Sequence, residues 1–148
     1  MRYNNLILLF ALSLSSIGCQ QTYLTVDPSI QPYFDRFHAR FGIYPYGVHA
    51  SLSYDLGGAY GKTFIRNNSK SILVLESYWA IATDGGKENL IYHEIGHALF
   101  RLQHNDIKDI FGCPISIMHS KSFGDDWCYA ENRFQLLNQF EALIKNYK

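Results

Sequence analysis

Several features that would narrow the class of this protein are missing from its sequence. The most apolar stretch in its 148 residues, Leu6–Leu14, is too short to span a bilayer. Its 13 Lys and Arg residues are balanced by 13 Asp and Glu residues, so no excess of positive charge points to a nucleic-acid partner. No C-x-x-C pair occurs among the three cysteines, which argues against a cysteine metal site. The chain also has no repeat or low-complexity tract, and its length and aromatic content suit one domain.

The N-terminus has the pattern of an export signal. Arg2 precedes the apolar stretch, as in a secretory signal peptide. The segment Ser16-Ile17-Gly18-Cys19 resembles the lipobox of bacterial lipoproteins, with Ser16 where an aliphatic residue is usual. We predict a signal peptide over residues 1–18, a lipid anchor on Cys19 and a short tether over residues 19–26. The alternative is an ordinary signal peptide with an unrelated cysteine.

The cysteine count agrees with export. If Cys19 carries the lipid, Cys113 and Cys128 remain as an even pair. We expect this pair to form a disulfide in an oxidising compartment. A closed loop of this length contributes about 3 kcal/mol of stability through chain entropy. The mature protein is then expected in a bacterial cell envelope, in the periplasm or at the outer membrane or cell surface, where its lipid anchor holds it to the membrane.

Two segments of the remaining domain, residues 27–148, have the spacing of amphipathic helices. The first follows the capping pair Asp27-Pro28 and ends near Gly42. Its apolar positions are Ile30, Phe34, Phe37 and Phe41. The second lies at the C-terminus, after an irregular stretch that ends at about Cys128, with apolar residues at Leu136, Phe140, Leu143 and Tyr147.

The segments between these helices have strand patterns. Residues 48–54 alternate apolar and polar side chains, as in a half-buried strand. Residues 63–66 and 71–76 flank the polar stretch 67–70, as in a hairpin. The apolar run 72–75 does not alternate, which predicts burial on both faces. Together with the helices, these strands predict an α+β fold.

A second helix, expected after Thr83-Asp84-Gly85-Gly86, carries the most informative motif of the chain. His93-Glu94-Ile95-Gly96-His97 reads H-E-x-x-H. On a helix, positions i and i+4 lie on the same face, so both imidazoles can bind one metal ion. Glu94 then lies beside the metal, where it can transfer protons. Zinc hydrolases are built on this arrangement.

The apolar residues of the same helix indicate where the histidines point. Ile91, Ile95, Ala98 and Leu102 recur at i, i+4, i+7 and i+11, which makes one stripe toward a core. The two histidines lie about 200° round the helix from this stripe. We therefore expect them to face a cleft.

A catalytic zinc site also needs a third protein ligand, and His104 is the next histidine along the chain. In a straight helix His104 would lie about 16 Å from His93 along the axis, too far to share one ion. The chain must therefore leave the helix between about Leu99 and Gln103. No glycine or proline marks a turn there.

With its third histidine, the segment resembles the metzincin zinc peptidases, whose pattern is H-E-x-x-H-x-x-G-x-x-H followed by a methionine turn. His104 comes one residue late, and Phe100 stands where the family has its turn glycine. Ser116-Ile117-Met118 resembles the methionine turn. Small bacterial lipoproteins described as zinc metallopeptidases have a similar helix, late histidine and S-I-M segment. Residues 78–79 and 113–118 also look like that group, and the resemblance covers roughly residues 72–118.

The resemblance implies a fold and a set of roles. The fold would be a compact zincin domain, with a small mixed sheet packed on the N-terminal helix and the active-site helix, and a C-terminal helix. His93, His97 and His104 would bind Zn²⁺, Glu94 would be the general base, and Met118 would be structural. The substrate would be a peptide or protein that lies along a sheet edge. We expect the protein to be a monomer.

Other residues compete for the third ligand position. Glu131 lies near the last helix, where a gluzincin has its glutamate, and Asp106 or Asp109 could serve as in an aspzincin. His119 follows Met118 and could line the site or add a fourth ligand.

Tyr129, His38 and His49 are further residues whose side chains could take part in catalysis. Tyr129 could donate a hydrogen bond to an oxyanion, although a tyrosine in a chain so rich in aromatics is more typical of the core. His38, among phenylalanines, and His49, on the polar side of a strand, are expected to have no catalytic role.

Two functions compete on this sequence. The first is a zinc-dependent peptidase. The alternative is a non-catalytic envelope lipoprotein in which zinc is structural or a surface binds a partner. Glu94 distinguishes them, because a purely structural zinc site has no use for a general base.

Overall fold

The computed structural model describes residues 25–67 and 69–147. The predicted signal peptide, Cys19 and most of the predicted tether lie outside the described residues. At the end of that tether, Val26 forms a parallel bridge with Ala50. None of the described helices is long and apolar enough to cross a membrane.

The elements follow in the order α1 (Gln31–Phe41), β1 (Val48–Ser53), β2 (Gly61–Arg66), β3 (Ser69–Leu75), α2 (Glu76–Ile81), α3 (Asp84–Phe100) and α4 (Trp127–Lys145).

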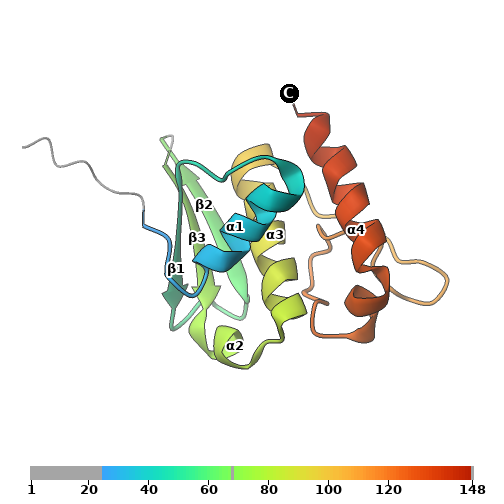
Figure 1. Ribbon diagram of the computed structural model, residues 1–148. Coiled ribbons are helices and arrows are strands. Elements are labelled where there is room, and N and C mark those ends of the chain that lie inside the picture. The colour runs from blue at the N-terminus through green and yellow to red at the C-terminus, as the bar shows by residue number, and fades with distance from the viewer. Residues whose placement is uncertain (1–24, 68, 148) are drawn as a thin grey trace, which may run out of the picture.

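The three strands form a mixed sheet, which agrees with the predicted α+β fold. The strand order is β1-β3-β2, with β3 parallel to β1 and antiparallel to β2. Figure 1 shows the sheet on one side of α1 and α3, with α4 on the other side. The motif helix α3 is therefore the centre of the domain, and β2 is an edge strand.

The predicted hairpin is confirmed, but its second strand is less buried than expected. Arg66 pairs with Ser69, so the turn is shorter than predicted. In β3, Ile72 and Val74 are fully buried, whereas Leu73 and Leu75 are only partly buried. The prediction of burial on both faces is wrong, because the helices cover one face of this small sheet and the described residues cover the other less completely.

The N-terminal helix begins later than predicted. Asp27 Oδ1 accepts a hydrogen bond from the Ser29 backbone N–H at 2.8 Å, which closes a turn ahead of the helix. The helix itself starts at Gln31, with Pro32 in its first turn. Its end agrees with the prediction, because Gly42 adopts a left-handed conformation with φ of 69°.

Helix α3 begins at Asp84, inside the segment of residues 83–86 that the sequence predicted to precede it. Thr83 is the N-cap and accepts a hydrogen bond from the Gly86 N–H, so both glycines belong to the first turn. A side chain at Gly86 would collide with the carboxylate of Asp125. The glycine therefore lets the segment before α4 pack directly on the start of α3.

The short helix α2 was not predicted. It carries Tyr78 and Trp79 into the core, and the Trp79 indole N–H donates to the Ser29 hydroxyl at 2.9 Å. Six residues are too few for a clear helical period in the sequence.

The C-terminal helix is present, but its buried stripe differs from the predicted one. Leu136 and Phe140 are buried as expected. Leu143 is only partly buried, and Tyr147 lies beyond the helix and is 56% exposed. Ile144 takes the buried position instead, because the helix turns a slightly different face toward α3 than the i, i+4, i+7, i+11 pattern indicated.

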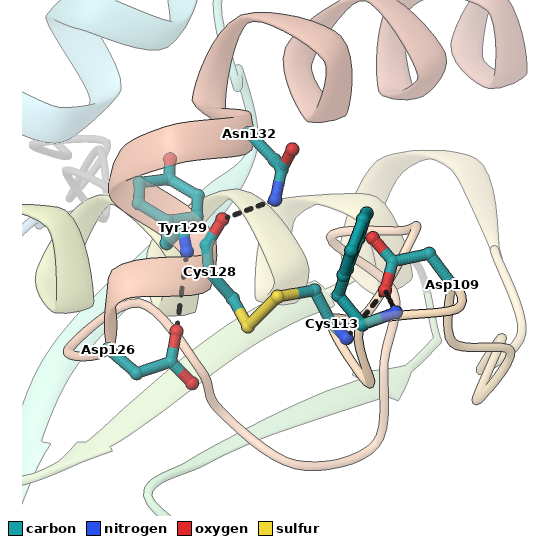
Figure 2. Close-up of a disulfide and its surroundings, with 7 residues drawn as sticks. Asp109, Cys113, Asp126, Cys128, Tyr129 and Asn132 are labelled. Carbon is teal, nitrogen blue, oxygen red and sulfur yellow. Dashed lines mark hydrogen bonds between the residues drawn. A yellow bond between two sulfur atoms is a disulfide. The ribbon is translucent and has the colours of Figure 1, made fainter.

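The predicted disulfide between Cys113 and Cys128 is confirmed (Figure 2). It joins the irregular segment after α3 to the first turn of α4. Asp109 Oδ1 accepts hydrogen bonds at 2.9 Å from the backbone N–H groups of Phe111 and Cys113. The disulfide and this carboxylate together fix a segment that has little regular structure of its own.

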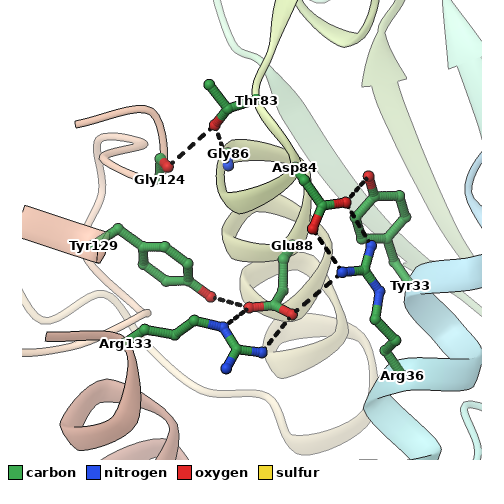
Figure 3. A network of polar contacts seen from close by, with 9 residues as sticks. All are labelled: Tyr33, Arg36, Thr83, Asp84, Gly86, Glu88, Gly124, Tyr129 and Arg133. Carbon is green, nitrogen blue, oxygen red and sulfur yellow. Dashed lines mark hydrogen bonds and ion pairs between the residues drawn. The ribbon is translucent and has the colours of Figure 1, made fainter. Parts of the chain in front are cut away.

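A buried carboxylate ties the three long helices together (Figure 3). Glu88 on α3 is 1% exposed, accepts from the Tyr129 hydroxyl at 2.6 Å, and pairs with Arg133 through two hydrogen bonds of 2.7 and 2.8 Å. Arg36 on α1 lies 3.8 Å from Glu88 and forms two hydrogen bonds of 2.7 Å with Asp84. This network holds α1 and α4 against the motif helix.

Glu88→Gln is expected to lower the free energy of unfolding by about 2 kcal/mol, because it removes the buried charge that pairs with the half-exposed guanidinium of Arg133. Denaturant unfolding measures the effect. Glu131→Gln makes the same change at an exposed position of α4 and should alter the stability by less than about 0.5 kcal/mol. Equal stabilities of the two variants would contradict a structural role of the network.

Candidate metal centre

The structure brings His93, His97 and His104 together. His93 and His97 lie one turn apart on α3, and His104 comes from the segment after the helix. His97 Nε2 lies 3.0 Å from His93 Nε2 and 3.1 Å from His104 Nε2. Each residue offers one nitrogen, and all three nitrogens lie within 4.8 Å of one another, so the group can hold a metal ion.

Hydrogen bonds at Nδ1 of His93 and His97 fix the tautomer of each ring. Nδ1 of His93 lies 2.9 Å from the Ile117 carbonyl, and Nδ1 of His97 lies 2.7 Å from the Leu102 carbonyl. A carbonyl only accepts, so both Nδ1 atoms must carry the proton. The Nε2 atoms then present lone pairs to each other at 3.0 Å, which is unfavourable unless a cation lies between them.

Burial keeps these two rings neutral. It lowers the pKa of His93 to about 4, against the opposing effect of the Ile117 carbonyl, and it also lowers the pKa of His97. Both imidazoles are therefore unprotonated at Nε2 at neutral pH, which is the form that binds metals.

The third histidine reaches the others through a sharp turn at Arg101. The chain leaves α3 after Phe100, and Arg101 adopts a left-handed conformation with φ of 52°. The Arg101 N–H bonds to the His97 carbonyl, and the Leu102 N–H bonds to the Gly96 carbonyl, each at 3.2 Å. The predicted exit from the helix is thus confirmed. A non-glycine residue in this conformation costs about 1 kcal/mol, which the surrounding contacts must offset.

The segment Ser116–Met118 lies under the histidines. Its Ile117 carbonyl orients His93, and the Met118 carbonyl accepts from the Asn105 N–H at 2.8 Å, next to His104. Met118 is fully buried, and a Cβ built at Gly96 would stand 2.7 Å from its sulfur. Glycine within the motif is therefore required for Met118 to pack against the helix.

Glu94 is held between α3 and β2. Its side chain is buried, and its Oε2 lies 2.6 Å from the Thr63 hydroxyl, which donates to it. A Cβ at Gly61 would lie 2.5 Å from Oε1, so the strand can approach only because residue 61 is glycine. Burial raises the pKa of Glu94 to about 7, and the Thr63 hydrogen bond opposes that shift.

These groups line one open cleft of about 830 Å³. Its sides are residues 58–63 and 65, which include part of β2, and residues 119–122, which follow Met118. The histidines and Glu94 face this cleft from α3, as the position of the apolar stripe predicted. Ile91, Ile95 and Ala98 of that stripe are fully buried in the core, and Leu102 is buried just beyond the helix.

The alternative ligands lie outside the three-histidine group. Asp106 accepts a hydrogen bond of 2.7 Å from the Ser120 N–H, and Asp109 caps its own loop. Glu131 is exposed on α4. His119 lines the cleft but is not a member of the group.

Tyr129, His38 and His49 do not line the metal cleft. Tyr129 is 1% exposed and donates to Glu88, so it has the core position that the sequence favoured over an oxyanion donor. His38 packs edge-on against Tyr44, and His49 lies on β1.

Two residues of the site were missed in the sequence. The sequence indicates Thr63 only as the start of a strand, and Arg101 only as part of an unmarked exit from the helix. Nothing in the local pattern distinguishes Thr63 from other strand residues, since its contact with Glu94 spans 31 positions. The roles of Thr63 and Arg101 both depend on tertiary packing.

No protein-family model, curated protein or solved structure shows a significant match to this chain. Its function therefore has to be inferred from the chemistry of the site.

Proposed function

We propose that the protein is a zinc-dependent peptidase with a metzincin-like site. The observation that carries this proposal is a buried carboxylate, Glu94, next to three convergent imidazoles in an open cleft. A purely structural metal site would not require this carboxylate or this access.

The donor set supports zinc. Two nitrogens at about 2.0–2.1 Å from a tetrahedral zinc ion lie about 3.3 Å apart. The Nε2 pairs of the cluster, at 3.0 and 3.1 Å, are close to that spacing. His93, His97 and His104 would hold the ion and leave one position open to the cleft, as in catalytic zinc sites.

Zinc, when bound, supplies a Lewis acid that acidifies water and polarises a peptide carbonyl. Glu94 accepts the proton of the attacking water and delivers it to the leaving amine. In the protein without a bound ion, burial raises the pKa of Glu94 to about 7, and the carboxylate lines the cleft where it can accept a proton. The Thr63 hydroxyl holds the carboxylate in one orientation.

The edge strand β2 offers a place for the substrate backbone. Its inner edge pairs with β3, and residues along it line the cleft. An extended peptide would add to the free edge through backbone hydrogen bonds and pass the metal site. The disulfide supports the proposed location in an oxidising envelope compartment.

Removal of the metal is expected to abolish cleavage. Protein treated with a chelator should no longer cleave a mixture of unfolded polypeptides, as followed by mass spectrometry of the products. One equivalent of Zn²⁺ should restore the activity, whereas Mg²⁺, which prefers oxygen ligands, should not. Undiminished cleavage by the metal-free protein would contradict the proposed function.

A further inference from the structure

A single buried side-chain donor lacks a partner among residues 25–67 and 69–147, namely Nδ2 of Asn89. Asn89 is 2% exposed. A buried donor without a partner costs about 1–3 kcal/mol, and folded proteins tolerate few of them. The amide of Asn89 is therefore poised for an acceptor from outside the chain.

This amide belongs to the metal cleft. Asn89 lines the cleft and lies one turn before His93 on α3, about 6 Å along the axis and on the same side. A Cβ built at Gly124 would stand 2.7 Å from the Asn89 Cβ, so the segment after Met118 packs directly on this residue. Asn89 thus lies in the lining of the cleft where that segment packs on α3.

The charges around the cleft also favour a ligand that brings oxygen acceptors. Its lining contains three basic residues, Lys62, Arg101 and Lys121, and one acidic residue, Glu94. With a bound cation the balance becomes more positive. A substrate that brings oxygen acceptors, and carboxylates in particular, is attracted to such a surface.

We propose that Asn89 is a specificity residue that selects peptides with an oxygen-bearing side chain, Gln, Glu, Asn or Asp, next to the scissile bond. Its amide donates to the side-chain oxygen of the substrate residue that enters this end of the cleft. The terminal torsion of an asparagine is soft, so the amide can turn toward the substrate at little cost. The proposal rests on the proposed peptidase function, because it takes the occupant of the cleft to be a peptide.

The first test is a stability measurement that does not depend on catalysis. Asn89→Leu keeps the shape of the side chain and removes the unpartnered donor, so it should raise the melting temperature of the zinc-loaded protein by about 3–6 °C. Asn146→Leu makes the same change at an exposed position at the end of α4, where the side chain has no hydrogen bond to the described residues, and should give no such gain. A lower melting temperature for Asn89→Leu would show that the amide is satisfied within the folded protein and would overturn the proposal.

The second test measures selectivity. Labelled decapeptides that differ only in Gln, Glu, Leu or Lys at one position on either side of the cleavage site would be bound to the Glu94→Gln variant and also cleaved by the wild type. We expect Gln and Glu peptides to be preferred over Leu and Lys peptides by about tenfold. Adding Asn89→Leu should remove the Gln preference, while Asn146→Leu should keep it.

The two tests separate this proposal from the function on which it rests. If peptides are cleaved without any preference that depends on Asn89, the peptidase stands and the specificity proposal fails. If the Glu94→Gln variant binds with the expected preference but the wild type cleaves nothing, the specificity site stands and the hydrolytic function fails. Absence of binding to every peptide overturns the specificity proposal.

Discussion

Glu94→Gln is expected to reduce peptide hydrolysis by about 10²–10⁴-fold, the usual contribution of a general base, while one metal ion stays bound per chain. The amide has nearly the same shape and can still receive the Thr63 hydrogen bond, but it cannot accept a proton from water. The measurement combines the cleavage rate with the metal content of the same sample. Loss of activity with full metal content is the signature of a proton-transfer residue.

The matched control is Glu131→Gln, which makes the same change at an exposed position outside the cleft. It should leave the rate and the metal content unchanged. Equal cleavage by the wild type and the Glu94→Gln variant would rule out the proposed mechanism and favour a non-catalytic role for the metal.

His104→Ala is expected to weaken zinc binding by at least about 100-fold, because loss of a direct ligand exceeds the 10–100-fold effects of residues that only support ligands. Competition with a chromophoric chelator measures the affinity. The effect on the fold should be small, since His104 is exposed and lies outside the helices. Activity should fall with the metal content.

Variants of the competing residues sharpen this result. His119→Ala removes a histidine from the same cleft, and Asp106→Asn removes the nearest competing carboxylate in the chain; both should keep nearly all of the zinc. An unchanged affinity in His104→Ala with a large loss in Asp106→Asn or Glu131→Gln would move the third ligand to that residue.

The central part of the site could be predicted because it depends on local geometry. The i, i+4 spacing of His93 and His97 and the apolar positions Ile91 and Ile95 fix which side of α3 faces the cleft and which faces the core. The disulfide could be predicted once Cys19 was assigned to the lipid anchor, because Cys113 and Cys128 then remain as a pair. These are consequences of helix period and residue chemistry, which tertiary packing does not change.

The exit from the helix could only be inferred from distance. The requirement that His104 reach His97 indicated a turn, but the residue that makes it, Arg101, has no intrinsic preference for a positive φ. The turn is stabilised by its own carbonyl contacts, including that of Leu102 with His97. A conformation that depends on such contacts leaves no mark in the local sequence.

Most of the remaining errors concern which faces of β3 and α4 are buried. The burial of β3 was overestimated because an apolar run cannot show that only one face of a three-stranded sheet meets helices. The buried stripe of α4 was placed on Leu143 instead of Ile144, since the last turns of a helix satisfy several apolar spacings. Thr63 could not be recognised because it acts on a carboxylate in a different element.

The central claim is that His93, His97 and His104 bind one zinc ion. The most direct measurement is a crystal structure of the zinc-loaded protein with anomalous diffraction recorded on both sides of the zinc absorption edge. We expect one anomalous peak per chain, at about 2.0–2.1 Å from the Nε2 atoms of all three histidines. A peak bound by only two of them, or located outside this cleft, would contradict the account.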